Sequence, residues 1–101
     1  GDIVIDPAGG EVSKADKIIT LTPKEYHLLC YMAQNANQIL TKQMICSEVW
    51  KDSYEGYDNT IMVHIRKLRQ KLEDNPSSPK YIITVKGLGY KLKIQRRGSL
   101  I

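Results

Sequence analysis

The chain has 101 residues, of which 42% are hydrophobic and 26% charged, a size and composition that suit one globular domain with a single core. No apolar run approaches the roughly 20 residues of a membrane-spanning helix and no signal-peptide pattern is present, so we expect a cytoplasmic protein. The net charge of +4 is unevenly divided, because residues 1–59 hold five Lys or Arg against nine Asp or Glu, whereas residues 60–101 hold ten against two. This asymmetry favours a polyanionic partner on one side of the molecule, and either nucleic acid or anionic lipid would satisfy it.

The first 21 residues alternate between short apolar stretches and turn signals. Apolar residues occur at Ile3–Ile5, at Val12 and at Ile18–Leu21, and PAGG and KAD separate them. This pattern predicts short antiparallel strands joined by turns. Because the chain begins with Gly1 instead of methionine and enters a strand-like segment at once, it is expected to be part of a longer protein.

A helix start follows in the segment TPKE. Thr22 is suited to be the N-cap, Pro23 takes the first helical position and Glu25 the third, which makes a capping box with the favoured N1 proline. The segment QNAN breaks the apolar pattern, so the helix should end near Asn35–Asn37.

A second helix is predicted from Thr41, its expected N-cap, through Trp50, where the turn-rich loop KDSYEGYD begins. Cys30 and Cys46 each lie in an apolar helical pattern, without CxxC spacing and without a histidine at metal-ligand spacing. We therefore expect two buried free thiols and no metal site.

The third predicted helix is DNTIMVHIRKLRQKLE, from Asp58 to Glu73, with Asp58 or Asn59 as its cap. At about 100° per residue, four apolar residues form one buried stripe. These are Ile61, Ile65, Leu68 and Leu72. The opposite face is basic, with one apolar residue in it, and it is made of Asn59, Val63, Arg66, Lys67 and Gln70, with Thr60 and Lys71 beside them. Guanidinium groups next to a methyl-bearing side chain suit the reading of a DNA major groove, although a basic face can also be simply solvated.

The segment YIITVKGLGYKLKI predicts a hairpin with strands at Tyr81–Val85 and Tyr90–Ile94, and Gly87 and Gly89 are first of all turn residues in it. An exposed basic helix followed at once by a hairpin is typical of an α+β winged helix-turn-helix with an N-terminal antiparallel sheet, three helices and a C-terminal β-hairpin wing. We divide the chain into a winged-helix domain (1–95) and a tail (96–101). Within the domain lie the N-terminal strands (1–21), the three-helix core (22–73) and the wing hairpin (81–94).

The stretches LTPKEYHLL, TKQMICSEVW, NTIMVHIRKLRQKLE and YIITVKGLGYKL, in this order and spacing, resemble the C-terminal DNA-binding domain of OmpR/PhoB-type response regulators. The resemblance runs from about Leu21 to Leu92. It implies an effector domain that binds double-stranded DNA at direct-repeat promoter sites and contacts RNA polymerase. It also implies a receiver domain and a histidine kinase in the full-length system, no membrane partner and no cofactor. These residues contain no receiver domain.

The resemblance also implies roles for individual residues. Base-reading positions fall on Asn59, Val63, His64, Arg66 and Lys67. Phosphate and wing contacts fall on Lys42, Trp50, Thr60, Arg69, Thr84 and Lys86. The polymerase-contacting loop corresponds to Lys51, Asp52, Ser53, Tyr54, Glu55, Gly56 and Tyr57. Lys67 stands where relatives commonly have arginine, which favours phosphate binding over bidentate contact with guanine.

Other interpretations remain open at this point. Trp50 suits a core residue as well as a phosphate contact, and His64 suits a packed imidazole as well as a base contact. A winged helix that binds protein would show an apolar patch on its outward face, and one that binds RNA an aromatic stacking platform. The acidic loop around Glu55 lacks the histidine, glycine-rich cradle or activated nucleophile of an enzyme, so no catalysis is expected.

Overall fold

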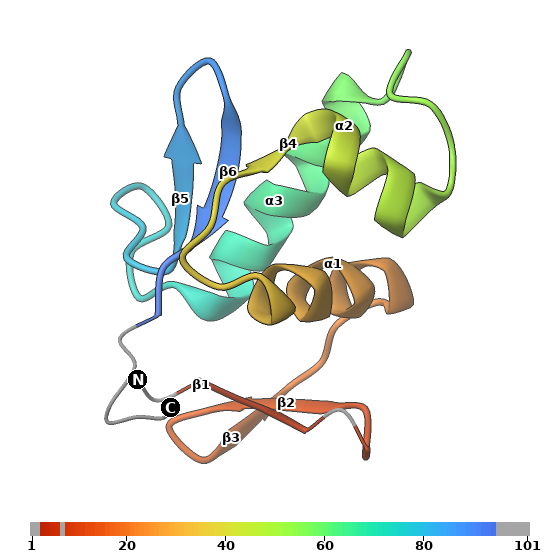
Figure 1. Ribbon diagram of the computed structural model, residues 1–101. Coiled ribbons are helices and arrows are strands. Elements are labelled where there is room, and N and C mark those ends of the chain that lie inside the picture. Colours follow the sequence, from red (N-terminus) through yellow and green to blue (C-terminus); the bar gives the residue numbers. More distant parts are fainter. Residues whose placement is uncertain (1–2, 7, 95–101) are drawn as a thin grey trace.

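The computed structural model describes residues 3–6 and 8–94, which form a winged helix-turn-helix (Figure 1). In chain order the elements are β1 (Ile3–Asp6), β2 (Glu11–Lys14), β3 (Lys17–Ile19), α1 (Pro23–Gln34), β4 (Leu40–Thr41), α2 (Lys42–Ile45), η1 (Cys46–Trp50), α3 (Asp58–Leu72), β5 (Ile82–Val85) and β6 (Gly89–Leu92). The predicted fold class is therefore confirmed. The predicted tail 96–101 lies outside the described residues.

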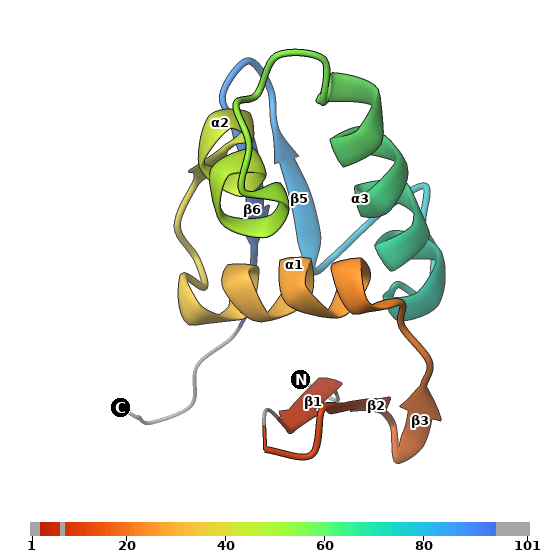
Figure 2. The same ribbon diagram turned by 90° about the vertical axis from the view of Figure 1, so that its right-hand side faces the viewer.

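The N-terminal strands form one antiparallel sheet in the order β1-β2-β3, as predicted. Ala15 and Asp16 join β2 to β3, with φ angles of 51° and 68°. A two-residue loop with positive φ at both positions matches the right-handed twist of a hairpin. Figure 2 shows this sheet on the far side of α1 from the rest of the molecule.

The predicted capping box at the start of α1 is present. The Thr22 hydroxyl accepts from the Glu25 backbone N–H at 3.2 Å, and the Glu25 carboxylate accepts from the Thr22 N–H at 3.0 Å. The helix ends at Gln34 with Asn35 as its C-cap, inside the predicted boundary.

The second helix also follows the prediction, with one difference in geometry. The Thr41 hydroxyl accepts from the Met44 N–H at 3.1 Å and caps α2, and the helical path continues to Trp50. Its second half, η1, is wound as a π-helix, and Lys51 ends it in a left-handed conformation (φ 55°). Both cysteines are free, but only Cys46 is buried as predicted. Cys30 is half-buried, because it lies on the side of α1 away from the buried residues Leu28, Leu29 and Met32.

Strand β4 was not predicted. It makes the second sheet three-stranded, in the order β4-β6-β5, by pairing Leu40 with Tyr90 and Thr41 with Gly89. The interpretation of Gly89 as a turn residue was wrong, since it is the first residue of β6. A Cβ atom on Gly89 would lie 2.1 Å from the Leu40 carbonyl oxygen, so the close approach of β4 requires glycine there.

The predicted cap of the third helix was also wrong. α3 begins at Asp58 with Tyr57 in the N-cap position and without a side-chain cap. The Asp58 carboxylate instead accepts from Lys42 and Tyr54, so it does not turn back to the helix N–H groups. The helix ends at Leu72, one residue before the predicted end.

The apolar stripe of α3 is buried as predicted, because each of its four residues is at most 1% exposed. It packs into one core with residues from α1, η1 and the wing, among them Leu28, Leu29, Met32, Val49 and Ile82. Burial of apolar area at roughly 25 cal/mol per Å² is the main force that fixes α3 against α1. The opposite face of α3 therefore points out of the molecule (Figure 2).

Candidate nucleic-acid interface

The outward face of α3 has the polar composition expected from the sequence. Asn59, Arg66 and Lys67 are exposed, and Val63 and His64 are half-buried at its edges. The residues at all five predicted base-reading positions are thus at least partly exposed on α3.

The four cations in the second half of α3 divide into two pairs. Within residues 3–6 and 8–94, Arg66 and Lys67 form neither an ion pair nor a side-chain hydrogen bond, whereas Arg69 forms side-chain hydrogen bonds and Lys71 forms an ion pair with the protein itself. The first pair is directed to solvent. The second holds the fold together.

Arg69 ties α3 to the wing. Its Nε and one Nη donate to the Ile82 carbonyl oxygen at 3.0 and 2.9 Å, and that Nη also donates to the Thr84 hydroxyl at 2.7 Å. Hydrogen bonds from a charged donor are roughly twice as strong as neutral ones. Two predicted phosphate contacts, Arg69 and Thr84, are therefore bonded to each other.

Lys71 ties α3 to α1 through Glu25. Its ammonium lies 2.5 Å from the Glu25 carboxylate, whose side chain is only 2% exposed. Burial on its own raises the pKa of Glu25, but the hydrogen bonds from Lys71 and the Thr22 backbone outweigh it, and the pKa lies below its ordinary value. Glu25 is thus both a helix cap and the buried partner of Lys71.

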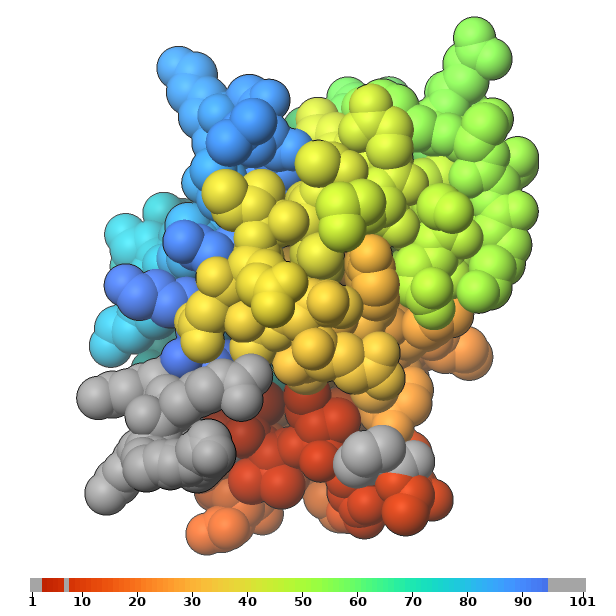
Figure 3. Space-filling view, in the orientation of Figure 1, coloured from red at the N-terminus to blue at the C-terminus, as the bar shows by residue number. Residues whose placement is uncertain are grey.

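The wing turn projects beyond the body of the protein. The Leu88 N–H donates to the Val85 carbonyl at 2.9 Å and closes a four-residue turn with Lys86 exposed in it. Gly87 has a φ of 78°, a conformation that favours glycine. Leu88, 58% exposed, places an apolar side chain beside Lys86. In Figure 3 the wing turn (blue) and the loop 51–57 (green) project at the end of the molecule away from the N-terminal strands.

A hollow of about 470 Å³ lies between the wing turn and the start of α2. Lys42 and Lys86 line it, together with Tyr54 and Met62. Since Met62 and Arg66 are four residues apart on α3, they share a helix face, and that face adjoins the hollow. Lys42, Lys86 and the outward face of α3 therefore belong to one surface.

Lys42 already has an anionic partner on this surface. Its ammonium donates to Asp58 Oδ1 at 2.7 Å, and the Tyr54 hydroxyl donates to the same oxygen at 2.7 Å. The hydrogen bond to Asp58 raises the pKa of Lys42, and the bonds from Lys42 and then Tyr54 lower the pKa of Asp58.

Trp50 and His64 pack against each other, at a centroid separation of 5.0 Å and an angle of 86°. The His64 Nδ1 lies 2.8 Å from the Thr60 carbonyl, which can only accept, so Nδ1 carries the proton. The ring centroids of Tyr57 and Trp50 are 6.0 Å apart, and the Lys24 ammonium lies 5.9 Å from the centroid of the Trp50 ring. These contacts fix the rings of Trp50 and His64 at the rim of α3.

The loop from Lys51 to Tyr57 is held by its own side chains. Asp52 accepts from the Ser53 N–H at 2.8 Å and from the Tyr57 hydroxyl at 3.1 Å, and the Cys46 thiol donates to the Ser53 carbonyl at 3.3 Å. Glu55 and Gly56 are exposed at the tip. The loop thus presents an ordered polar surface beside α3.

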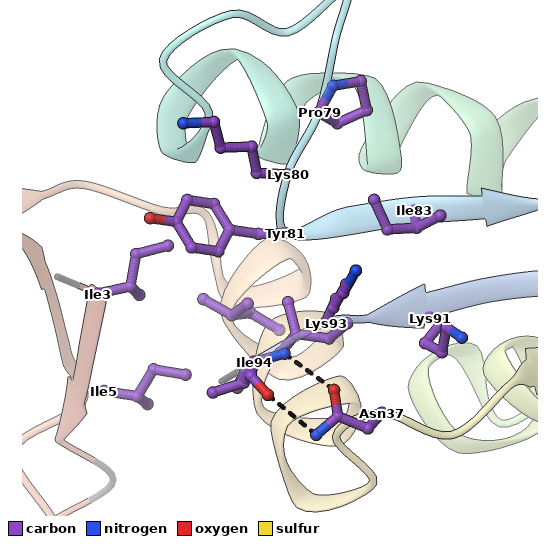
Figure 4. A pocket seen from close by; sticks show the side chains of 12 residues that line it. Ile3, Ile5, Asn37, Pro79, Lys80, Tyr81, Ile83, Lys91, Lys93 and Ile94 are labelled. Atoms are coloured by element: carbon purple, nitrogen blue, oxygen red, sulfur yellow. Dashed lines mark hydrogen bonds between the residues drawn. The ribbon is translucent and has the colours of Figure 1, made fainter. Parts of the chain in front are cut away.

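A larger groove, of about 850 Å³, lies between β1 and the base of the wing (Figure 4). Apolar side chains of Ile3, Ile5 and Ile83 line it, and the Asn37 amide bonds the Ile94 backbone in both directions at 3.0 and 3.1 Å. None of the predicted DNA-contacting residues is among those that line it. The groove is therefore separate from the surface that Lys42, Lys86 and the outward face of α3 form.

Sequence reasoning missed the partners that three carboxylates have within the protein. It did not assign Asp58 to Lys42, Glu25 to Lys71, or Glu73 to the wing, where the carboxylate accepts from the backbone N–H groups of residues 80–82. These pairs are 7 to 46 residues apart, and no local pattern signals them. Within the described ranges, no group of three His, Cys, Asp or Glu side chains is placed to hold a metal ion. No helix there is both long and apolar enough to cross a membrane.

The sequence and the structure both match known proteins. Residues 16–92 match the family model described as the C-terminal domain of transcriptional regulatory proteins. The uncharacterised transcriptional regulatory protein YcbL of Bacillus subtilis is 44% identical over 90 residues, which are 89% of this chain and 40% of YcbL, so the chain spans less than half of that relative.

Two solved structures have the same fold. One is the RstA DNA-binding domain of Klebsiella pneumoniae, crystallised in complex with the RstA box, with a TM-score of 0.86, 30% identity and 92% of both chains covered. The other is the response regulator DrrB of Thermotoga maritima, an OmpR/PhoB homologue, with a TM-score of 0.83, 33% identity, and 92% of this chain and 42% of DrrB covered.

Proposed function

The chain belongs to the family of C-terminal domains of OmpR/PhoB-type transcriptional regulators, and on that premise we propose that it binds double-stranded DNA sequence-specifically, with α3 in the major groove and the wing on the backbone or minor groove. The observation that carries the proposal is that, among the described residues, two of the four cations in the second half of α3 bind the protein itself and two do not. Arg69 and Lys71 bind other residues of the fold, while Arg66 and Lys67 face solvent without partners in the described part of the chain.

In this proposal the exposed residues of α3 read base edges. The Arg66 guanidinium suits the O6 and N7 atoms of guanine, and the Asn59 amide suits adenine. Val63 offers methyl groups to thymine. His64 has Nε2 as its acceptor nitrogen, because Nδ1 donates to Thr60, and Lys67 supplies a point charge.

Phosphate contacts position the helix and carry no sequence information themselves. We assign them to Lys42, Trp50, Thr60, Arg69, Thr84 and Lys86, of which Lys86 is exposed on the wing turn. Arg69 and Thr84, bonded to each other, would reach a phosphate as one unit.

The remaining parts of the proposal concern the whole regulator. RNA polymerase would meet the loop from Lys51 to Tyr57, which projects at the same end as the wing (Figure 3). A receiver domain and its histidine kinase would control the DNA-binding domain, which takes up residues 1–95. The protein would act in the cytoplasm at direct-repeat promoter sites, and it would not catalyse a reaction.

The test is a salt series of binding affinity, measured by fluorescence anisotropy on a random duplex and on the promoter region beside the gene itself. We expect tighter binding to the promoter and a slope that reports several phosphate contacts, at about 0.9 per contact. No binding to either duplex at low salt would refute DNA binding and leave the basic surface to a protein partner.

A further inference from the structure

The ion pair between Lys42 and Asp58 stands on the proposed DNA surface, unlike the pair between Lys71 and Glu25. Lys42 and Asp58 keep 34% and 52% of their side-chain exposure, whereas Glu25 keeps 2%. An incoming anion can therefore reach Lys42 without any opening of the core.

The carboxylate of Asp58 resembles a bound phosphate, because it presents an anionic oxygen that accepts hydrogen bonds. One oxygen, Oδ1, accepts from the Lys42 ammonium and from the Tyr54 hydroxyl, both at 2.7 Å. Lys42 also lines the hollow that contains Lys86, where the backbone of a bound duplex would run in the proposed function. Asp58 thus occupies the partner position that a phosphate oxygen would take.

We propose that Asp58 is a positioning residue for DNA binding, whose carboxylate holds Lys42 in the free protein and must be exchanged for a DNA phosphate in the complex. This inference rests on the proposed function and adds a competitor to it. The exchange lowers the affinity for every duplex by the strength of the Lys42–Asp58 pair, and the hydroxyl of Tyr54 keeps the carboxylate in place when Lys42 leaves.

A double-mutant cycle tests the proposal. The four proteins are the native chain, Asp58→Asn, Lys42→Gln and the double variant, and each is titrated on the random duplex and on the promoter duplex at several salt concentrations. With Lys42 present, Asp58→Asn should tighten binding about two- to fivefold, the range that a partly exposed ion pair represents. With Lys42 replaced, the gain should largely disappear.

A second measurement is one that a merely structural role would not change. In the Asp58→Asn background, Lys42→Gln should lower the salt slope by about one, since Lys42 is then free to neutralise a phosphate. Asp52→Asn is the matched control, because Asp52 lies in the loop that precedes Asp58 and also accepts from a tyrosine, yet it has no lysine partner among residues 3–6 and 8–94. It should show no coupling to Lys42.

The outcomes separate the two proposals. Equal gains from Asp58→Asn with and without Lys42 would show that Asp58 only repels DNA, and the inference would be overturned while DNA binding stands. Absence of binding by the native chain would overturn the proposed function itself. If circular dichroism shows that Asp58→Asn unfolds the start of α3, Asp58→Ser replaces it in the same cycle.

Discussion

Replacing Gly89 with alanine should destabilise the domain far more than replacing Gly87. On Gly89 a Cβ atom would lie 2.1 Å from the Leu40 carbonyl oxygen and 2.9 Å from the Thr41 Cα, both backbone atoms of β4. Since ordinary contact begins at 3.4 Å, the strands would have to separate by about 1.3 Å. Such a separation breaks both residue pairs that join β4 to β6.

We expect a loss of about 3 kcal/mol or more for Gly89→Ala, from overpacking together with lost backbone pairing. Gly87→Ala is the control, because its Cβ would meet no atom within 4 Å and only the left-handed φ of 78° opposes it. That conformation costs a non-glycine residue about 1–2 kcal/mol.

Urea and thermal unfolding followed by circular dichroism measure both variants. At about 4–8 °C per kcal/mol for a domain of this size, the expected loss of about 1–2 kcal/mol lowers the midpoint by roughly 4–16 °C for Gly87→Ala. The same factor applies to both variants, so the midpoint should fall further for Gly89→Ala, whose expected loss is about 3 kcal/mol or more. Equal losses of stability in the two variants would refute the steric account of β4. So would hydrogen exchange in which, for both variants, only the backbone amides of the wing turn exchange faster.

Three further predictions concern charge. Lys86→Ala should weaken binding to promoter and random DNA alike and lower the salt slope by about one. The control Lys93→Ala, at the other end of the wing, should change neither the affinity nor the slope. If Lys86→Ala changed only the sequence preference, Lys86 would be a base reader. Arg66→Ala should cost roughly 1–3 kcal/mol at the specific site, and an unchanged ratio of specific to random affinity would remove it from the readers. Glu25→Gln should cost about 1–3 kcal/mol of unfolding free energy at neutral pH. Because the folded pKa of Glu25 lies below its ordinary value of 4.5, its stabilisation is present above that pH and fades as the pH falls through the folded pKa. The native chain and Glu25→Gln should therefore converge in stability in acid, and a constant difference in urea titrations would contradict this assignment.

The features predicted correctly from the sequence depend on neighbours in the chain. The capping box at Thr22 and Glu25 joins residues three apart, and the buried stripe of α3 repeats every three to four residues. Hairpin and helix identities follow from the same short-range periods. Local pattern was therefore enough for the fold class and for the direction in which α3 faces.

The features that were missed or wrong depend on contacts between distant segments. β4 has two residues, too few for a strand pattern, and it exists because β6 pairs with it some fifty residues later in the chain. Asp58 has the residue type of an N-cap, but Lys42 and Tyr54 offer its carboxylate stronger, charge-assisted partners than a backbone N–H. Such competition is decided by the packed structure.

The outward face of α3 shows that a count of basic residues exceeds the number of cations that have no partner among the residues that the structure describes. Counted from the sequence, residues 66–71 provide four cations for DNA. In the structure Lys71 neutralises the buried Glu25, and Arg69 holds the wing through Ile82 and Thr84. The bonds from Arg69, together with those from Glu73, hold strand β5 of the wing against α3. Under the proposed function, Lys86 and Arg66 would contact one duplex together, and the bonds from Arg69 to the wing would help to hold them in that arrangement.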